Sequence, residues 1–244
     1  MRHVVLVLVV ALAGCDGVFN LDKLHLPPDS AVDAPPLDAS LDDGLVLHLS
    51  FDGNLTDSVS GVPAACVGGA NTCPKLAAGN LGSAAAFDGA DDCLTANLSV
   101  VGTVITVALW FNVPTDTSVS LIAKPYTGAL DSWQIDTDSN RTLRFISFDT
   151  NGATGVVLPT AFTVNTWVHV AITYDGASVR NLYVNGSLRA NDGPSQFAID
   201  TGPVYIGCDR DGGAPARHMA GSLDDVRVYR RVLTADEIKA LANL

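Results

Sequence analysis

The sequence predicts an all-β domain with a short C-terminal helix, and three observations carry that prediction. From Gly44 onward, short apolar runs alternate with clusters of Gly, Asn, Asp and Pro, which is typical of strands joined by turns. Asn185 and Gly186 lie between two such runs, and Asn-Gly is the preferred pair for a two-residue type I′ hairpin. A helical pattern is found at the C-terminus, from Thr234 onward.

The N-terminal sequence predicts an export signal. A short positive N-terminus precedes the apolar run 4–14, which is too short to span a bilayer and fits a signal peptide. The sequence LAGC that ends at Cys15 resembles the lipobox of bacterial lipoproteins. The resemblance implies cleavage before Cys15, a diacylglyceryl group on its sulfur, and a lipid anchor in the bacterial cell envelope. The alternative is an ordinary cleaved signal, which leaves Cys15 as a free thiol.

Residues 15–43 are predicted to form a disordered tether. This stretch is rich in Asp, Ala and Pro, and it contains seven acidic residues against one lysine. It has too little apolar surface to fold, while its prolines and like charges favour an extended chain. The sequence therefore divides into a signal peptide at 1–14, a tether at 15–43 and one domain at 44–244.

Strand-like runs follow one another through the domain. The first, 45–51, ends at the turn sequence Asp-Gly-Asn, and others lie at 104–111, 143–148, 167–174 and 221–229. The C-terminal helix is predicted from a capping box, with Thr234 at the N-cap and Glu237 at the third helical position. Ile238 and Leu241 then share one helical face.

The charge of the chain excludes nucleic acid as a partner. The formal net charge is -12 and the pI is about 4.5, so phosphate backbones are repelled and no basic stripe is present. Anionic membrane surfaces are disfavoured for the same reason.

The cysteine count fits an exported protein. Four cysteines remain after Cys15, an even number suited to two disulfides in an oxidising compartment. Cys66 and Cys73 flank a short glycine-rich loop that is easily closed, which favours a local bridge and leaves Cys93 to pair with Cys208. None of the four has the spacing of a zinc site.

Six segments resemble, in this order, the laminin-G-like jelly rolls of the concanavalin A-like lectin/glucanase superfamily: 49–61, 82–96, 105–113, 167–176, 182–186 and 221–238. The resemblance covers nearly all of the chain after the tether. It implies a two-sheet antiparallel jelly-roll sandwich in which the first and last parts of the domain lie together.

The resemblance also interprets the acidic sequence FDGADDC at 87–93. A strand is expected to end at Phe87, the chain to turn through Asp88 and Gly89, and the next strand to begin near Cys93. The aspartates of this stretch are therefore interpreted as turn residues beside a disulfide, not as an active site.

A calcium site is a further implication of the resemblance. Many laminin-G-like domains hold calcium through aspartates and backbone carbonyls at a rim of the sandwich, and Ca²⁺ takes several oxygen ligands. The candidates are Asp52 and Asp57, near the first strand, and Asp225, in the last. The alternative is that Asp52 and Asp57 only form turns by bonding to their own backbone. A bound ion is expected to hold loops in place.

The chain is not expected to be an enzyme. Glycoside hydrolysis generally needs a pair of carboxylates, and the only glutamate, Glu237, is explained by the capping box. Asp224 and Asp225 are sequence neighbours, which point to opposite sides of a regular strand unless a bulge intervenes. Glycoside hydrolysis is kept as the weakest alternative.

A recognition function is expected instead. Tyr126 and Trp133 are candidates for stacking on a sugar, and Arg210 and Arg217 for polar contacts, although Trp133 also suits a core position and the arginines also suit solvent. We expect a lipid-anchored, non-catalytic module that binds a polysaccharide or other glycan. The alternative is a protein-binding adhesion module or a structural component of the envelope.

Overall fold

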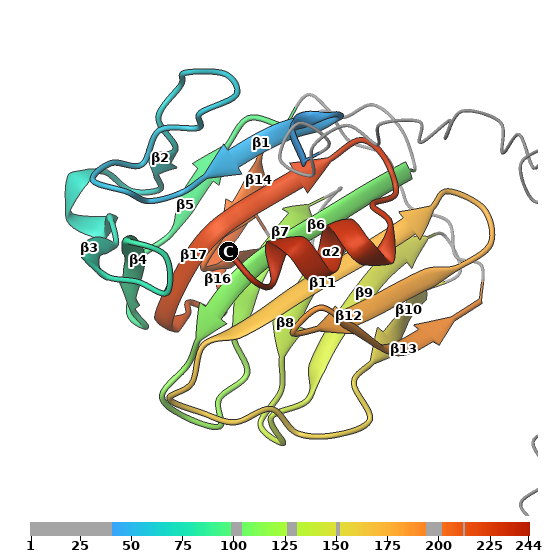
Figure 1. Ribbon diagram of the computed structural model, residues 1–244. Coiled ribbons are helices and arrows are strands. Elements are labelled where there is room, and N and C mark those ends of the chain that lie inside the picture. The colour runs from blue at the N-terminus through green and yellow to red at the C-terminus, as the bar shows by residue number, and fades with distance from the viewer. Residues whose placement is uncertain (1–40, 99–103, 126–130, 150–151, 194–201, 212) are drawn as a thin grey trace, which may run out of the picture. The chain divides into compact units, whose positions relative to one another are not determined.

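The computed structural model describes residues 41–98, 104–125, 131–149, 152–193, 202–211 and 213–244, which all belong to the unit Leu37–Leu244. Two large antiparallel sheets pack against each other, so the all-β prediction is confirmed (Figure 1). Cys15 and the tether up to residue 40 lie outside the described residues.

The eight-stranded sheet brings the first and last strands of the domain together. Its order is β13 (Ser187–Asp192), β12 (Arg180–Val184), β11 (Val168–Asp175), β6 (Val104–Asn112), β17 (Ala220–Tyr229), β4 (Ser83–Asp88) and β3 (Lys75–Ala78). The strand β1 (Leu45–Leu49) also pairs with β17, as the resemblance implied. β1 ends two residues before the predicted strand end because Phe51 has φ +60, which no extended strand adopts.

The seven-stranded sheet has the order β10 (Gly152–Val157), β9 (Leu143–Asp149), β8 (Asp131–Thr137), β7 (Ser120–Pro125), β14 (Val204–Ile206), β5 (Leu94–Ala96) and β2 (Ala65–Cys66). A two-stranded hairpin, β15 (Asp209–Asp211) and β16 (Ala214–Ala216), follows β14, and a 3₁₀ turn, η2 (Ala70–Thr72), follows β2.

A hydrophobic core fills the space between the two sheets. On β11, which lies in the predicted strand-like run 167–174, Val168, Val170 and Ile172 lie in this core, and their alternate spacing is that of a strand with one buried face. Trp133 and Ile135 on β8 belong to the same core and come from the opposite sheet. Alternate residues of each strand therefore face outward, and the candidate binding groups must be sought among them.

The C-terminal helix α2 (Ala235–Leu241) covers part of the outer face of the eight-stranded sheet (Figure 1). The predicted capping box is confirmed: Thr234 Oγ1 accepts from Glu237 N, and the Glu237 carboxylate accepts from Thr234 N. Gly186 has φ +74, and a Cβ there would meet the helix backbone at Lys239, so the Asn-Gly hairpin and the helix fit together. No helix within the described residues is long and apolar enough to cross a membrane.

Both disulfides join the pairs favoured by the sequence. Cys66–Cys73 closes the glycine-rich loop, and Cys93–Cys208 joins the start of β5 to the residue before β15. Asp88 Oδ1 accepts from Ala90 N within the turn that follows β4, which confirms the turn predicted in the FDGADDC stretch.

A β-bulge interrupts β17. The pairing with β6 shifts register between Asp224 and Arg227, and Asp225 has φ +47. Leu223 before the aspartates and Val226 after them both lie in the core, so Asp224 and Asp225 both point to the outer face. The sequence placed them on opposite sides of a regular strand unless a bulge intervenes, and the structure has this bulge.

Candidate functional site

The four predicted ligand-binding residues have different positions. Tyr126 lies outside the described residues. Trp133 is 4% exposed and packs between the sheets, so its ring is not available to a ligand at the surface. Arg210 is half-buried on the β15–β16 hairpin. Arg217 lies at the outer face of the seven-stranded sheet, where it joins a polar network described below.

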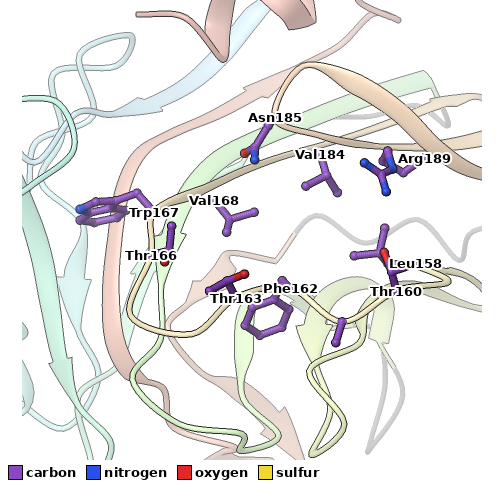
Figure 2. A pocket seen from close by; sticks show the side chains of 11 residues that line it. Leu158, Thr160, Phe162, Thr163, Thr166, Trp167, Val168, Val184, Asn185 and Arg189 are labelled. Atoms are coloured by element: carbon purple, nitrogen blue, oxygen red, sulfur yellow. The ribbon is translucent and has the colours of Figure 1, made fainter.

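A cavity lies where one end of the sandwich is closed by a loop. We call it the rim cavity: it has a volume of about 190 Å³ and lies between the loop that follows β10 and the β12–β13 hairpin (Figure 2). Its lining residues are Leu158, Thr160, Ala161, Phe162, Thr163, Thr166, Trp167, Val168, Val184, Asn185 and Arg189.

The rim cavity has an apolar floor and a polar edge. Leu158, Phe162 and Val168 are buried and form apolar wall, and the ring of Phe162 lies edge-on to Phe111 at 5.2 Å between centroids, which fixes it. Asn185 and Arg189 project from the hairpin, as Figure 2 shows. The lining contains three threonines and one arginine but no carboxylate, although the chain as a whole is strongly acidic.

The hairpin side of the rim cavity is held rigidly. Asn185 Oδ1 accepts from His169 N, and Asn185 N donates to His169 O, so the tip of the hairpin is tied to β11. Asn185 has φ +48, as expected of the first turn residue of a type I′ hairpin. The Asn185 side-chain oxygen is occupied, which leaves its amide NH₂ as the group that can contact a ligand.

A second polar group, the Arg217 network, consists of Gln134, Asp136, Arg144 and Arg217. Asp136 is fully buried and accepts from Arg144 Nε at 2.9 Å, Arg144 Nη2 at 2.7 Å and Arg217 Nη2 at 2.7 Å. Gln134 Nε2 donates to the same carboxylate at 3.2 Å. The hydrogen bonds and the charge of Asp136 raise the pKa of Arg144, so this guanidinium is always protonated.

Two of the predicted calcium ligands are occupied by protein groups. Asp57 accepts from His48 N, Val59 N and Ser60 N, so it caps its own loop, as the turn interpretation expected. Asp225 bonds His48 Nε2 at 2.8 Å and Arg227 Nε at 3.0 Å. Burial alone raises the pKa of Asp225, but these two partners hold it below its usual value. A cation beside Arg227 is disfavoured, so these two carboxylates do not fit calcium.

Asp224, which the sequence prediction did not include, fits a cation better. It is 0% exposed; its Oδ2 accepts from Leu81 N at 2.8 Å, but Oδ1 has no partner in the described part of the chain. Burial raises the pKa of Asp224 to about 6, although hydrogen bonds from the backbone of Leu81 and Asn80 act to lower it. The third predicted ligand, Asp52, bonds Ser83 N at 2.9 Å at the end of the same turn between β3 and β4.

One cluster of three acids occurs among the described residues: Asp88, Asp91 and Asp92 have oxygens within 4.8 Å of one another. Asp88 and Asp91 are exposed, and the oxygens of Asp88 and Asp92 are turned to backbone amides of the same turn. This arrangement is explained by the turn.

The comparisons with known proteins identify the family and the fold. The family described as the concanavalin A-like lectin/glucanases superfamily, of the laminin G type, matches residues 87–239. No curated protein matches the sequence.

Several solved structures share the fold. Domain 4 of AbnA, a GH43 extracellular arabinanase from Geobacillus stearothermophilus solved in complex with arabinotriose, has 19% identity and a TM-score of 0.65, with 81% of this chain and 98% of that domain covered. The binding domain of Paraclostridial Mosquitocidal Protein 1 has 17% identity and a TM-score of 0.66, over 83% of this chain and 52% of that one. The receptor binding domain of botulinum neurotoxin D has 17% identity and a TM-score of 0.63, over 83% and 53%. The chain thus spans about half of the toxin domains, and likeness at these identities shows the fold alone.

Proposed function

Because the chain belongs to the concanavalin A-like lectin/glucanases superfamily, we propose that its domain is a non-catalytic recognition module that binds carbohydrate at the rim cavity. The observation that carries this proposal is the lining of the cavity, which combines an apolar floor with threonine, asparagine and arginine side chains that can form hydrogen bonds. Sugar rings present apolar C–H faces and a rim of hydroxyl groups, and such a lining complements both. The arabinotriose bound to the AbnA domain lends support by analogy of fold.

The size of the rim cavity favours a small unit of a larger glycan. Pockets for drug-sized ligands measure roughly 300–1,000 Å³. The rim cavity, at about 190 Å³, therefore suits one sugar residue with its neighbours in solvent. Hydroxyl groups of Thr160 and Thr163 both donate and accept, as contact with sugar hydroxyls requires.

The positions of Asp224 and Asp225 support the non-catalytic part of the proposal. The bulge brings these carboxylates to one face, but they are 0% and 6% exposed. Asp225 is bound to both His48 and Arg227, and neither aspartate lines the rim cavity. A glycosidic bond and a water molecule must both reach such a pair in glycoside hydrolysis, and these side chains offer no such access.

Filling the rim cavity is expected to abolish glycan binding. Ala161 is an exposed lining residue, and Ala161→Trp places an indole in the space proposed for the sugar. We expect the affinity for the best ligand of an oligosaccharide panel to fall by at least about tenfold, the equivalent of about 1.4 kcal/mol. Isothermal titration measures the change.

The matched control is Ala177→Trp, at an exposed turn residue between β11 and β12 that does not line the cavity. This variant should bind like the parent. Equal affinity for Ala161→Trp and the parent would place the glycan elsewhere on the domain.

We also propose that Ca²⁺ binds Asp224 and Asp52 beside the turn between β3 and β4. The proposal is supported by the unpartnered buried oxygen of Asp224 and by the preference of Ca²⁺ for carboxylate oxygens. The ion would supply positive charge to a carboxylate that burial destabilises, and it would join β17 to this turn. Asp52 is retained from the predicted set, while Asp224 takes the place of Asp57 and Asp225.

Calcium is expected to raise the melting temperature of the chain by about 5–10 °C at a concentration 100 times its dissociation constant. Chelator should reverse the shift, and Asp224→Asn should remove it. Asp91→Asn, in the acidic turn after β4, is the control and should keep the shift. Loss of the shift in Asp91→Asn alone would move the ion to that turn.

Finally, we propose that Cys15 carries a lipid and that residues 15–43 tether the domain to a membrane of the bacterial envelope. The support is the lipobox-like sequence after an apolar run of signal-peptide length. The full chain expressed in bacteria with labelled palmitate should incorporate the label, and Cys15→Ala should not. Equal labelling of both chains would contradict the anchor.

A further inference from the structure

The Arg217 network lies on the outer face of the seven-stranded sheet, and the strand that carries Arg144 pairs with the end of the strand that leads into the rim cavity. Arg144 on β9 pairs with Val157 at the end of β10, and the next residue, Leu158, lines the cavity. Leu158 N also donates to Leu143 O, next to Arg144. A polymer that leaves the cavity and turns around the end of β10 onto the outer face of the sheet would reach Arg144 first and then Arg217.

The network presents positive charge outward. Two guanidinium groups share one fully buried carboxylate, and Arg144 and Arg217 keep 29% and 25% of their side chains exposed. Asp136 already accepts from both arginines and from Gln134. The Asp136 carboxylate thus has its hydrogen-bond donors, and the guanidinium hydrogens that do not bond to it can bind another acceptor.

A second carboxylate, Asp138, lies near Arg144. Its negative charge raises the pKa of Arg144 and offsets part of the positive potential around that guanidinium, although the carboxylate accepts from Asn140 N and Thr142 N of its own loop. Arg217 has φ +51, a left-handed conformation that costs free energy for a residue other than glycine.

We propose that the Arg217 network is an anion subsite, which binds a carboxylate or sulfate group of an acidic polysaccharide while a neighbouring sugar occupies the rim cavity. This inference rests on the carbohydrate recognition proposed above. Guanidinium groups bind carboxylate and sulfate oxygens through paired, charge-assisted hydrogen bonds, so they select for such groups over neutral hydroxyls. Because the whole chain repels polyanions, binding must come from this local positive charge.

The test compares acidic and neutral probes on the full chain in mild detergent. The probes are polygalacturonate fragments, their methyl-esterified counterparts, a sulfated polysaccharide and a neutral arabinan. We expect Arg217→Gln to weaken binding of the carboxylated or sulfated probe by at least about tenfold and to leave neutral binding unchanged. Arg230→Gln, an exposed arginine after β17, makes the same change in net charge outside the network and should have no effect.

Each outcome bears on one proposal. The carboxylated and sulfated arms show which anion is preferred. Equal binding of acidic and neutral probes, or equal loss in Arg217→Gln and Arg230→Gln, would overturn the anion subsite and leave carbohydrate recognition intact. Failure of every probe to bind would instead refute carbohydrate recognition itself. Thermal melting of both variants near the parent temperature confirms that the comparison is made on folded protein.

Discussion

Loss of the Cys93–Cys208 disulfide is expected to lower the free energy of unfolding by about 4–5 kcal/mol. The bridge joins residues 115 positions apart, and the chain-entropy account assigns a larger stabilisation to a longer closed loop. It also ties the start of β5 to the segment that leads to β15. The double variant Cys93→Ser, Cys208→Ser, unfolded in urea under oxidising conditions, measures the loss.

The second disulfide provides the internal control. Cys66–Cys73 closes a loop with a separation of only 7 residues, for which the same account gives about 2–3 kcal/mol. Cys66→Ser, Cys73→Ser should therefore be the more stable of the two double variants. The reverse order would contradict the entropic explanation of this fold's stability.

Replacement of Arg180 by methionine is expected to destabilise the domain by about 2–4 kcal/mol. Arg180 is 2% exposed on β12, and it forms an ion pair with Asp192. Its Nη1 donates to Ser147 Oγ and to Thr154 O, which belong to the opposite sheet. The variant removes these hydrogen bonds and the ion pair, but Asp192 is partly exposed, so the cost stays below that of a fully buried charge. Urea unfolding measures the change.

Two variants decide whether the Arg180 hydrogen bonds are responsible. Arg180→Lys keeps the charge but lacks the planar guanidinium, so it should recover only part of the loss. Arg230→Met changes an exposed arginine and should stay within about 0.5 kcal/mol of the parent. Equal stability of Arg180→Met and the parent would show that the two sheets do not depend on this contact.

Local patterns were sufficient to predict much of the fold. The alternation on β11, the Asn-Gly hairpin and the Thr234 capping box each depend on a few neighbouring residues, and the structure confirms all three. The bulge at Asp225 is also marked in the sequence. Leu223 and Val226 are core residues three apart, a spacing that a regular strand cannot place on one face.

The binding groups were harder to predict because they come from separate parts of the chain. The rim cavity is lined by the loop after β10 and by the β12–β13 hairpin, and neither segment has a sequence pattern that predicts their contact. Trp133 was a candidate for sugar stacking with a core position as the alternative, and its alternate spacing with Ile135 favours the core position that the structure shows. The positions of Asp52, Asp57 and Asp225 in the sequence likewise do not reveal that Asp225 already pairs with His48 and Arg227.

Carbohydrate recognition at the rim cavity is the central claim, and a titration of the full chain with a panel of neutral and acidic oligosaccharides tests it most directly. We predict saturable binding of at least one glycan, lost in Ala161→Trp and retained in Ala177→Trp. Absence of binding to every glycan, with capture of a protein partner that Ala161→Trp does not disturb, would contradict the claim.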